Sequence, residues 1–267
     1  MVMQYRTIQE YSETIDVLGQ YTTQILVSFS NHSESLRDVI IRNLIARGIT
    51  SLTSILSLWK VGHFQDCWIL HRALLDRLFH LAALNEDNSF EAFNNWSFVQ
   101  NYDIKNKVLS DKKIRNKVPK ETLSFTKSEK KRYAEIKQEN IVWARRKPEE
   151  IAKNILNLPF LYNYGYDYAS TQVHPMADDG EGDYSRLIEN KPWPTGDHIA
   201  VIHNSILIQS LLTQNGLNAS TLHWRRIVYD FLSQCNHSLE LGNNVYLETW
   251  NKLQNAGSEF NWCRPSR

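Results

Sequence analysis

The chain reads Gly-His-Phe-Gln-Asp-Cys-Trp-Ile-Leu-His-Arg-Ala-Leu-Leu-Asp-Arg-Leu-Phe-His over residues 62–80, and the apolar run continues to about residue 85. A helix built from this stretch carries apolar side chains on nearly every side, which is typical of a helix in a protein interior. We therefore predict an all-α fold, a multi-helix bundle around a buried central helix at about 64–85.

A second stretch, residues 162–175, complements the first because its polar groups recur at helical spacing. Tyr162, Tyr166, Ser170 and His174 follow one another at every fourth residue, so they share one face of a helix. Charged and ring-bearing groups on otherwise buried helices suggest a polar site inside the helical core.

Composition excludes several classes of protein. Ten Gly and seven Pro in 267 residues are too few for a turn-rich β-sandwich or barrel, and the formal net charge of +1 indicates no overall preference for polyanions or membranes. The three cysteines are an odd number without a Cys-x-x-Cys pair, which favours a reducing compartment. No signal peptide and no run of about 20 apolar residues is apparent. We expect a cytoplasmic protein without a membrane segment.

Apolar periodicity predicts further helices at residues 6–30, 35–59, 90–109, 198–215 and 221–236. Charged pairs on one face predict an exposed helix at 127–147, and Pro148 followed by two acids predicts a short helix there. Residues 238–267 are predicted to form a weaker C-terminal tail. We predict one domain over residues 1–267, with a basic surface arm at 105–147 and an acidic, proline-containing loop at 176–197.

Arg72 and Asp76 are four residues apart, share a helix face and are able to bond to each other. Two interpretations stay open. The pair is an internal ion pair that sets the helix register, or it is an arginine held by a carboxylate to bind a phosphate or another anion.

His174 precedes a proline, which places it at a helix end, where a cationic imidazole is favoured. It is a helix cap or, together with Ser170 and Tyr166, part of a polar stripe. Tyr162 and Tyr166 are equally compatible with core rings whose hydroxyls find partners.

Other chemistries have weaker support. His63/Asp66, Asp76/His80 and His174/Asp178 are spaced so that one helical turn could bring each pair together, but the paired Glu-x-x-His motifs of a di-iron bundle and His-Glu-x-x-His are absent. The chain lacks the glycine-rich phosphate loops and the Gly-x-Ser-x-Gly turn of hydrolases. We expect neither a metal nor a cofactor.

The basic arm holds fifteen Lys or Arg residues against five Asp or Glu, a local net charge of +10. It is either a solvated surface or a site of contact with phosphates, whose affinity would fall steeply with salt. Tyr133 and Trp143 lie among the charges and could stack on unpaired bases. The candidate nucleic-acid contacts are Lys130, Lys131, Arg132, Arg145, Arg146 and Lys147.

Residues 62–85, with a Gly-x-x-x-Asp/Glu, aliphatic, Arg-x-Leu-Leu-Asp/Glu character, resemble a bacterial all-helical domain family of unknown function. The run of Tyr166, Ser170 and His174 is similar to that family's second signature, and the likeness extends over about residues 35–215. It implies a helical bundle in which the arginine, the acid and the histidine face one another, and it implies no activity.

More distantly, the arrangement resembles HEPN-type helical domains, many of which are ribonucleases of toxin or phage-defence systems. Those carry an arginine four to six residues before a histidine on one helix, whereas seven residues separate Arg72 from His80 here. The resemblance therefore implies that Arg72 and His174 supply the pair from different helices.

The first functional hypothesis is a HEPN-like, metal-independent ribonuclease or RNA-binding protein of a bacterial defence or toxin type. His174 would act as general acid and base, Arg72 would stabilise phosphate charge, Asp76 would orient Arg72, and Ser170 and Tyr166 would support the site. The alternative is a non-enzymatic binding or scaffold module whose buried polar cluster is structural. A sensor that binds a small anion at Arg72 lies between the two. RNA, a second copy of the chain and a partner protein are the candidate partners.

Overall fold

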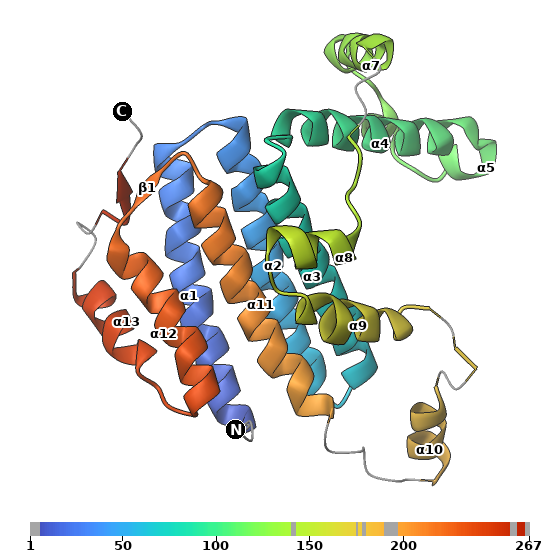
Figure 1. The fold of residues 1–267 in the computed structure, drawn as a ribbon. Coiled ribbons are helices and arrows are strands. Elements are labelled where there is room, and N and C mark those ends of the chain that lie inside the picture. The colour runs from blue at the N-terminus through green and yellow to red at the C-terminus, as the bar shows by residue number, and fades with distance from the viewer. Residues whose placement is uncertain are drawn as a thin grey trace. The chain divides into compact units, whose positions relative to one another are not determined.

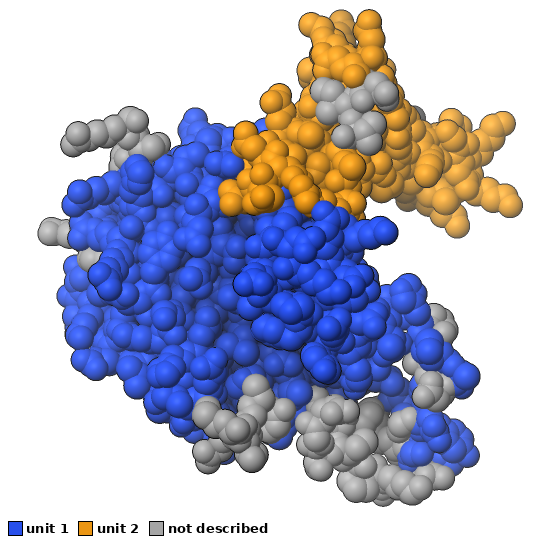
Figure 2. All heavy atoms as spheres, viewed as in Figure 1, with its two compact units in different colours: residues 1–83, 147–267 blue, residues 84–146 orange. Residues whose placement is uncertain are grey.

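Helices account for nearly all the regular structure in the computed structural model, which describes residues 6–139, 143–174, 176–177, 180–189, 197–256 and 261–264 (Figure 1). These residues fall into two units, 1–83 with 147–267 and 84–146, which Figure 2 shows in separate colours. The predicted all-α fold is confirmed. The prediction of one domain over residues 1–267 stays a prediction.

The first unit begins with three long helices and returns to them after the second unit. Its helices are α1 (Ile8–His32), α2 (Leu36–Lys60), α3 (Phe64–Glu86, whose last residues belong to the second unit), α8 (Pro148–Glu150), the π-helices η1 (Ile151–Ile155) and η2 (Leu161–Tyr166), α9 (Asp167–Thr171), α10 (Glu181–Glu189), α11 (Asp197–Ala219), α12 (Arg226–Leu241) and α13 (Tyr246–Asn255). Strands β1 (His223–Trp224) and β2 (Cys263–Arg264) form an antiparallel pair.

Local capping explains where the first helices begin. Thr7 and Glu10 form a reciprocal capping box at the start of α1, in which the Thr7 backbone N–H donates to the Glu10 carboxylate at 2.8 Å. The Ser35 hydroxyl accepts from the backbone N–H of Asp38 at the start of α2. Such caps satisfy backbone donors that have no partner within the helix.

Helices α1, α2 and α11 pack side by side, with α12 and α13 beyond them (Figure 1). Two glycines let α2 and α11 approach each other closely. A Cβ on Gly48 of α2 would lie 2.6 Å from the Leu212 side chain, and a Cβ on Gly216 of α11 would lie 2.9 Å from Ile41 Cγ2. Glycine weakens a helix interior, and Gly48 is accommodated because it has this packing role.

Helix α3 is buried along most of its length, as predicted. On one side it contacts α2, where Cys67 Sγ lies 3.4 Å from the Ile55 carbonyl oxygen, and α11, through His71. On another side it meets η2, where the rings of Phe79 and Tyr166 lie 5.7 Å apart. This position brings α3 into contact with both the core helices and the tyrosine-rich segment.

By length and composition, α2 would be able to cross a bilayer. Here its apolar face packs against α1 and α11, and Ile41, Ile45, Leu52 and Ile55 are fully buried. Core helices of water-soluble proteins also have this length and composition. Location in the cytoplasm stays a prediction.

The three cysteines are free and buried. Burial raises the pKa of the Cys67 and Cys235 thiols to about 12 and that of Cys263 to about 11. At neutral pH these thiols are therefore protonated and act as packing groups rather than nucleophiles.

The second unit contains α4 (Phe90–Ser110), α5 (Lys112–Arg115), α6 (Lys120–Leu123) and α7 (Lys127–Glu139). Its aromatic side chains stack on one another: the Tyr102 ring lies 3.9 Å from that of Phe125 and 4.0 Å from that of Tyr133. Trp143 packs 4.9 Å from Phe93. These rings hold together a unit that has few buried aliphatic residues.

Three sequence predictions of local structure are wrong. Helix α7 ends at Glu139, and residues 143–147 have no regular structure, because Trp143 turns inward onto Phe93 and Trp96. The predicted loop at 176–197 contains helix α10. Among its described residues, the predicted weak C-terminal tail contains α13 and β2, whose Cys263 pairs with Trp224 of β1.

Candidate functional site

The two stretches with the polar signatures meet at Arg72 of α3 and Tyr166 of η2. The Arg72 Nη2 group donates a hydrogen bond to the Tyr166 hydroxyl, and the guanidinium carbon lies 4.1 Å from the centre of the Tyr166 ring. Tyr166 is buried, with Phe79 and Tyr162 as aromatic neighbours. The arginine is thus held by a hydrogen bond and a cation–π contact together.

Ser170 and His174 follow Tyr166 along the same segment. The Ser170 hydroxyl donates to the Tyr166 carbonyl oxygen at 2.6 Å, a bond within one helical turn. His174 is exposed just beyond the end of α9, and its backbone N–H donates to the Ser170 carbonyl oxygen at 3.2 Å. Two helical turns place it roughly 12 Å beyond Tyr166 along the chain.

Two residues of the segment contact different parts of α3. Tyr166 contacts Arg72, whereas Tyr168, further along, packs 4.9 Å from Trp68, which precedes Arg72 on α3. Tyr168 thus lies beside the first turns of α3. The structure brings Arg72 and Tyr166 into contact; joint action of Arg72 and His174 stays a prediction.

Asp76 is half-buried one turn after Arg72, and its backbone carbonyl accepts a bond from His80 Nδ1 at 2.5 Å. The Arg72–Asp76 ion pair stays a prediction. His63 and Asp66 form an exposed contact of 3.7 Å, while Asp178 lies outside the described residues. Within the described part of the chain, no three His, Cys, Asp or Glu side chains come together as metal ligands.

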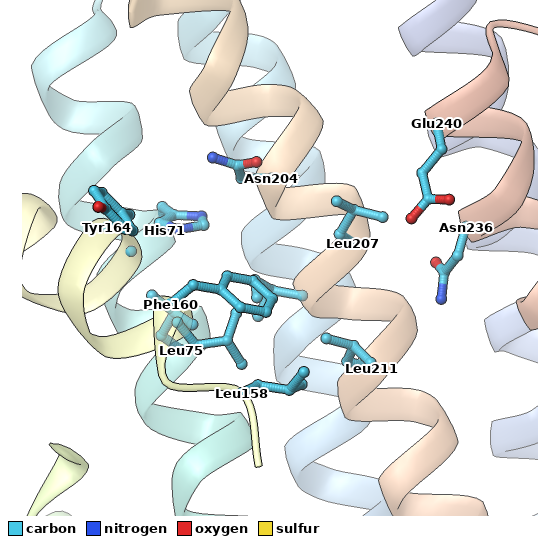
Figure 3. Close-up of a pocket in the computed structure, with 13 residues that line it drawn as sticks. His71, Leu75, Leu158, Phe160, Tyr164, Asn204, Leu207, Leu211, Asn236 and Glu240 are labelled. Atoms are coloured by element: carbon cyan, nitrogen blue, oxygen red, sulfur yellow. The ribbon is translucent and has the colours of Figure 1, made fainter. Parts of the chain in front are cut away.

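A pocket of about 250 Å³ opens beside this contact, on the surface of α11 (Figure 3). Its wall is formed by α3, by the chain from Leu158 to Gly165, by α11 and by α12. Most of the lining is apolar. The lining residues are His71, Leu75, Leu158, Phe160, Leu161, Tyr164, Gly165, Asn204, Leu207, Ile208, Leu211, Asn236 and Glu240.

The π-helix η2 shapes this pocket, because it brings Gly165 directly over α3. A Cβ at Gly165 would lie 3.1 Å from Leu75 Cδ1 and 3.9 Å from His71 Nε2. Glycine therefore lets η2 approach α3 closely and leaves the imidazole edge at the pocket wall. π-Helical turns are rare and occur frequently at functional sites.

His71 is the most deeply buried polar group in the lining, with 1% of its surface exposed. Its Nδ1 lies 2.9 Å from the Ser205 hydroxyl oxygen, and that hydroxyl donates to the Val201 carbonyl oxygen at 2.6 Å. Because the single hydroxyl proton is used there, His71 Nδ1 must carry a proton and donate to Ser205. Burial lowers the pKa of His71 to about 4, so at neutral pH the ring is neutral and Nε2 bears a lone pair.

Sequence reasoning missed His71 as a site residue, although a signal was present. His71 lies four residues after Cys67 and four before Leu75, on the apolar face of the helix. A histidine at such a position must be buried, and a buried histidine needs a partner. What no pattern in the sequence shows is that Ser205 supplies the partner and that Nε2 faces a pocket.

The predicted nucleic-acid contacts are only partly available in the second unit. Arg146 makes a bidentate ion pair with Asp87, and Arg132 lies over the Phe98 ring and donates to Asn95. Lys131 is 3.7 Å from Glu135. Lys130 and Arg145 are exposed in this unit, as is Lys147 in the first unit.

The two rings expected to stack on bases are used inside the second unit. Trp143 is buried, and Tyr133 stacks on Tyr102 and donates to Asp103 at 2.6 Å. The hydrogen bond to Asp103 and burial raise the pKa of Tyr133 to about 12. These rings stabilise the unit.

Another basic run, which the sequence prediction did not single out, lies at α5 and just after it. Lys112, Lys113, Arg115 and Lys117 are all exposed, and none is within ion-pair distance of a carboxylate among the described residues. Asp111 uses its side chain to cap α5 through the backbone N–H groups of Lys113 and Ile114. We call these four residues the α5 basic run.

Comparison with known proteins adds a family. One family model, described as a family of unknown function (DUF5677), matches residues 38–187. The match spans α2 to α10 and so contains Arg72, Tyr166, Ser170 and His174. No curated protein and no solved structure matches the chain.

Proposed function

The chain belongs to the DUF5677 family of unknown function, whose model covers more than half of it, and from its surface charge we propose that it is an RNA-binding protein with metal-independent ribonuclease activity. The α5 basic run carries the proposal. Of residues 84–146, fourteen are Lys or Arg and nine are Asp or Glu, a net charge of +5 for the second unit.

Exposed cations without carboxylate partners bind phosphates at the lowest cost, because no ion pair has to be broken first. The spacing of Lys112, Lys113, Arg115 and Lys117 within six residues concentrates four such charges. Release of counterions from the RNA backbone supplies the affinity, which is independent of sequence and sensitive to salt.

Cleavage is assigned to the first unit. His174 removes the proton of the ribose 2′-hydroxyl and returns a proton to the leaving 5′-oxygen, and Arg72 stabilises the charge on the phosphate. Tyr166 holds the guanidinium, Ser170 supports the turn before His174, and Asp76 orients Arg72 from one turn along α3. Since His174 lies two turns beyond Tyr166, the proposal requires residues 167–174 to close toward Arg72 when RNA is bound.

A second candidate function is a non-enzymatic binding or scaffold module, and helix α10 favours it. Tyr184, Leu187 and Ile188 are 59%, 72% and 69% exposed on this short helix. Exposed apolar side chains of this kind suit a partner protein. In this interpretation the Arg72–Tyr166 contact is structural.

Binding is tested by titrating single-stranded RNA at several salt concentrations against the wild type and a variant with all four residues of the α5 basic run changed to Gln. We expect the slope of log K against log salt to fall by up to about 3, because each lost phosphate contact on a single strand removes about 0.7.

The matched control also loses four positive charges, at three lysines and one arginine that are ion-paired in the structure: Lys137, Lys153, Arg226 and Lys252, each changed to Gln. Its salt slope should stay close to that of the wild type. If both variants lose the same affinity, only the net charge matters and the α5 basic run is not a site.

Cleavage is measured separately on the same RNA with a chelator present, for wild type, Arg72→Met and His174→Ala. We expect the rate to fall at least 100-fold in both variants. His174→Ala removes the acid–base group, and Arg72→Met removes the charge that stabilises the phosphate. RNA binding without cleavage would support RNA binding and contradict the ribonuclease activity. Absence of both binding and cleavage would support the scaffold module.

A further inference from the structure

The pocket on α11 differs chemically from a phosphate site. None of its lining residues is a lysine or an arginine, and its one carboxylate is that of Glu240. A polyanion has no cation to meet here and would be repelled by Glu240. The pocket therefore has a role separate from the RNA binding proposed above.

The lining carries three hydrogen-bond acceptors beside the donor-bearing side chains of Tyr164 and Asn204. His71 Nε2 bears a lone pair, since Nδ1 holds the ring proton, and no described residue donates to it. Asn236 Oδ1 on α12 is buried without a partner among the described residues. Glu240, one turn later on α12, adds a carboxylate.

Figure 3 shows the two ends of the pocket: His71, Tyr164 and Asn204 at one end, Asn236 and Glu240 at the other, and Leu207 and Leu211 of α11 between them. A buried acceptor that lacks a donor costs free energy, and a molecule that supplies the donor recovers it. Apolar walls with a few convergent polar groups are typical of small-molecule sites.

We propose that this pocket binds a small, largely apolar organic molecule that donates a hydrogen bond to His71 Nε2, with a second donor directed to Asn236 and Glu240. An N–H or O–H group on an aromatic or aliphatic ring meets this requirement. A volume of about 250 Å³ accommodates one ring system and excludes a folded peptide.

The test uses two probes of the same shape. Indole has one N–H donor, and 1-benzothiophene replaces that group with sulfur and has no donor. Binding to the full-length protein is followed by NMR, with nitrogen-15 in the histidine rings, so that the Nε2 signal of His71 reports directly on a donated hydrogen bond.

Indole is expected to bind saturably at millimolar concentration and to shift the His71 Nε2 signal. Benzothiophene should bind about fivefold to tenfold more weakly, the factor that one hydrogen bond contributes. In His71→Leu, which removes the acceptor and keeps an apolar side chain, the two probes should bind equally. The control His32→Leu changes an exposed histidine at the end of α1 and should behave as the wild type.

Filling the pocket provides an independent variant. Leu207→Trp and Leu211→Trp lie one turn apart on the partly exposed side of α11, and each should abolish binding of both probes while circular dichroism and RNA binding stay as in the wild type. The proposal is overturned if neither probe binds the wild type, if both bind it equally well, or if both tryptophan variants still bind indole.

Discussion

At the scale of single residues, His71 shows how one buried polar group links two helices. It lies on α3 and donates to Ser205 on α11. Because the Ser205 hydroxyl donates to the Val201 carbonyl oxygen, the ring proton of His71 is on Nδ1. The same bond directs the basic nitrogen toward the pocket. Position and tautomer thus follow from a single hydrogen-bond chain.

Burial of His71 has a consequence for stability at low pH. Its folded-state pKa of about 4 is below the ordinary value of 6.5, so between these values the unfolded chain binds a proton that the folded chain does not. Stability is fully present above pH 6.5 and is lost as the pH falls toward 4. Between pH 7 and pH 5 we expect His71 to account for a loss of about 2 kcal/mol in the free energy of unfolding.

Urea denaturation of wild type and His71→Leu at the two pH values measures this loss. The variant should show a smaller decrease between pH 7 and pH 5 than the wild type. His203 must be retained in both, because burial also lowers its pKa to about 4 and it contributes its own decrease. An identical decrease in the two proteins would show that His71 is protonated or exposed in the folded state.

At the scale of elements, the crossing of α2 and α11 depends on the absence of side chains. Gly216 faces Ile41 and Ile45 of α2, and a Cβ there would meet Ile41 Cγ2 at 2.9 Å. A β-branched side chain has little rotamer freedom in a helix, so Ile41 is unable to move away without backbone adjustment.

Gly216→Ala should therefore destabilise the protein. Overpacking costs about 1–3 kcal/mol, more than the roughly 1 kcal/mol by which alanine exceeds glycine in helix propensity. Gly19→Ala in α1 is the matched control, since nothing lies within 4 Å of its added Cβ, and it should stabilise by about 1 kcal/mol. Thermal denaturation of both variants decides the matter: equal stabilisation would mean that the two helices do not cross this closely.

At the scale of the whole molecule, the two units have different amounts of buried apolar material. The first unit contains fully buried rings and aliphatic side chains from most of its long helices. In the second unit, the buried apolar residues among those described are Leu84, Phe90, Leu123, Ile136 and Trp143. Little buried surface predicts low local stability.

We expect amide hydrogen exchange to report this difference. Backbone amides of α4 and α7 should exchange through openings of lower free energy than those of α2 and α11, and mild denaturant should remove their protection first. Exchange of both units at one common free energy would show that residues 84–146 unfold together with the rest, in agreement with the single domain predicted from the sequence.

The sequence alone determined where α1, α2, α3 and α4 lie to within a few residues, because each is a long run rich in apolar residues. It also indicated that the chain around Tyr166 would meet α3, since polar groups at four-residue spacing in an apolar segment need partners. It failed at α10, whose apolar side chains are exposed, and at the end of α7, where Trp143 turns inward.

Only the tertiary structure decided the pocket and the state of its histidine. The pocket requires side chains from α3, η2, α11 and α12 to surround one space. The tautomer of His71 requires the hydroxyl of Ser205, 134 residues away, to donate its proton to the Val201 carbonyl oxygen. Helices form from contacts a few residues apart, which a sequence pattern records. A cavity and a proton position arise from contacts between distant residues, which no local pattern contains.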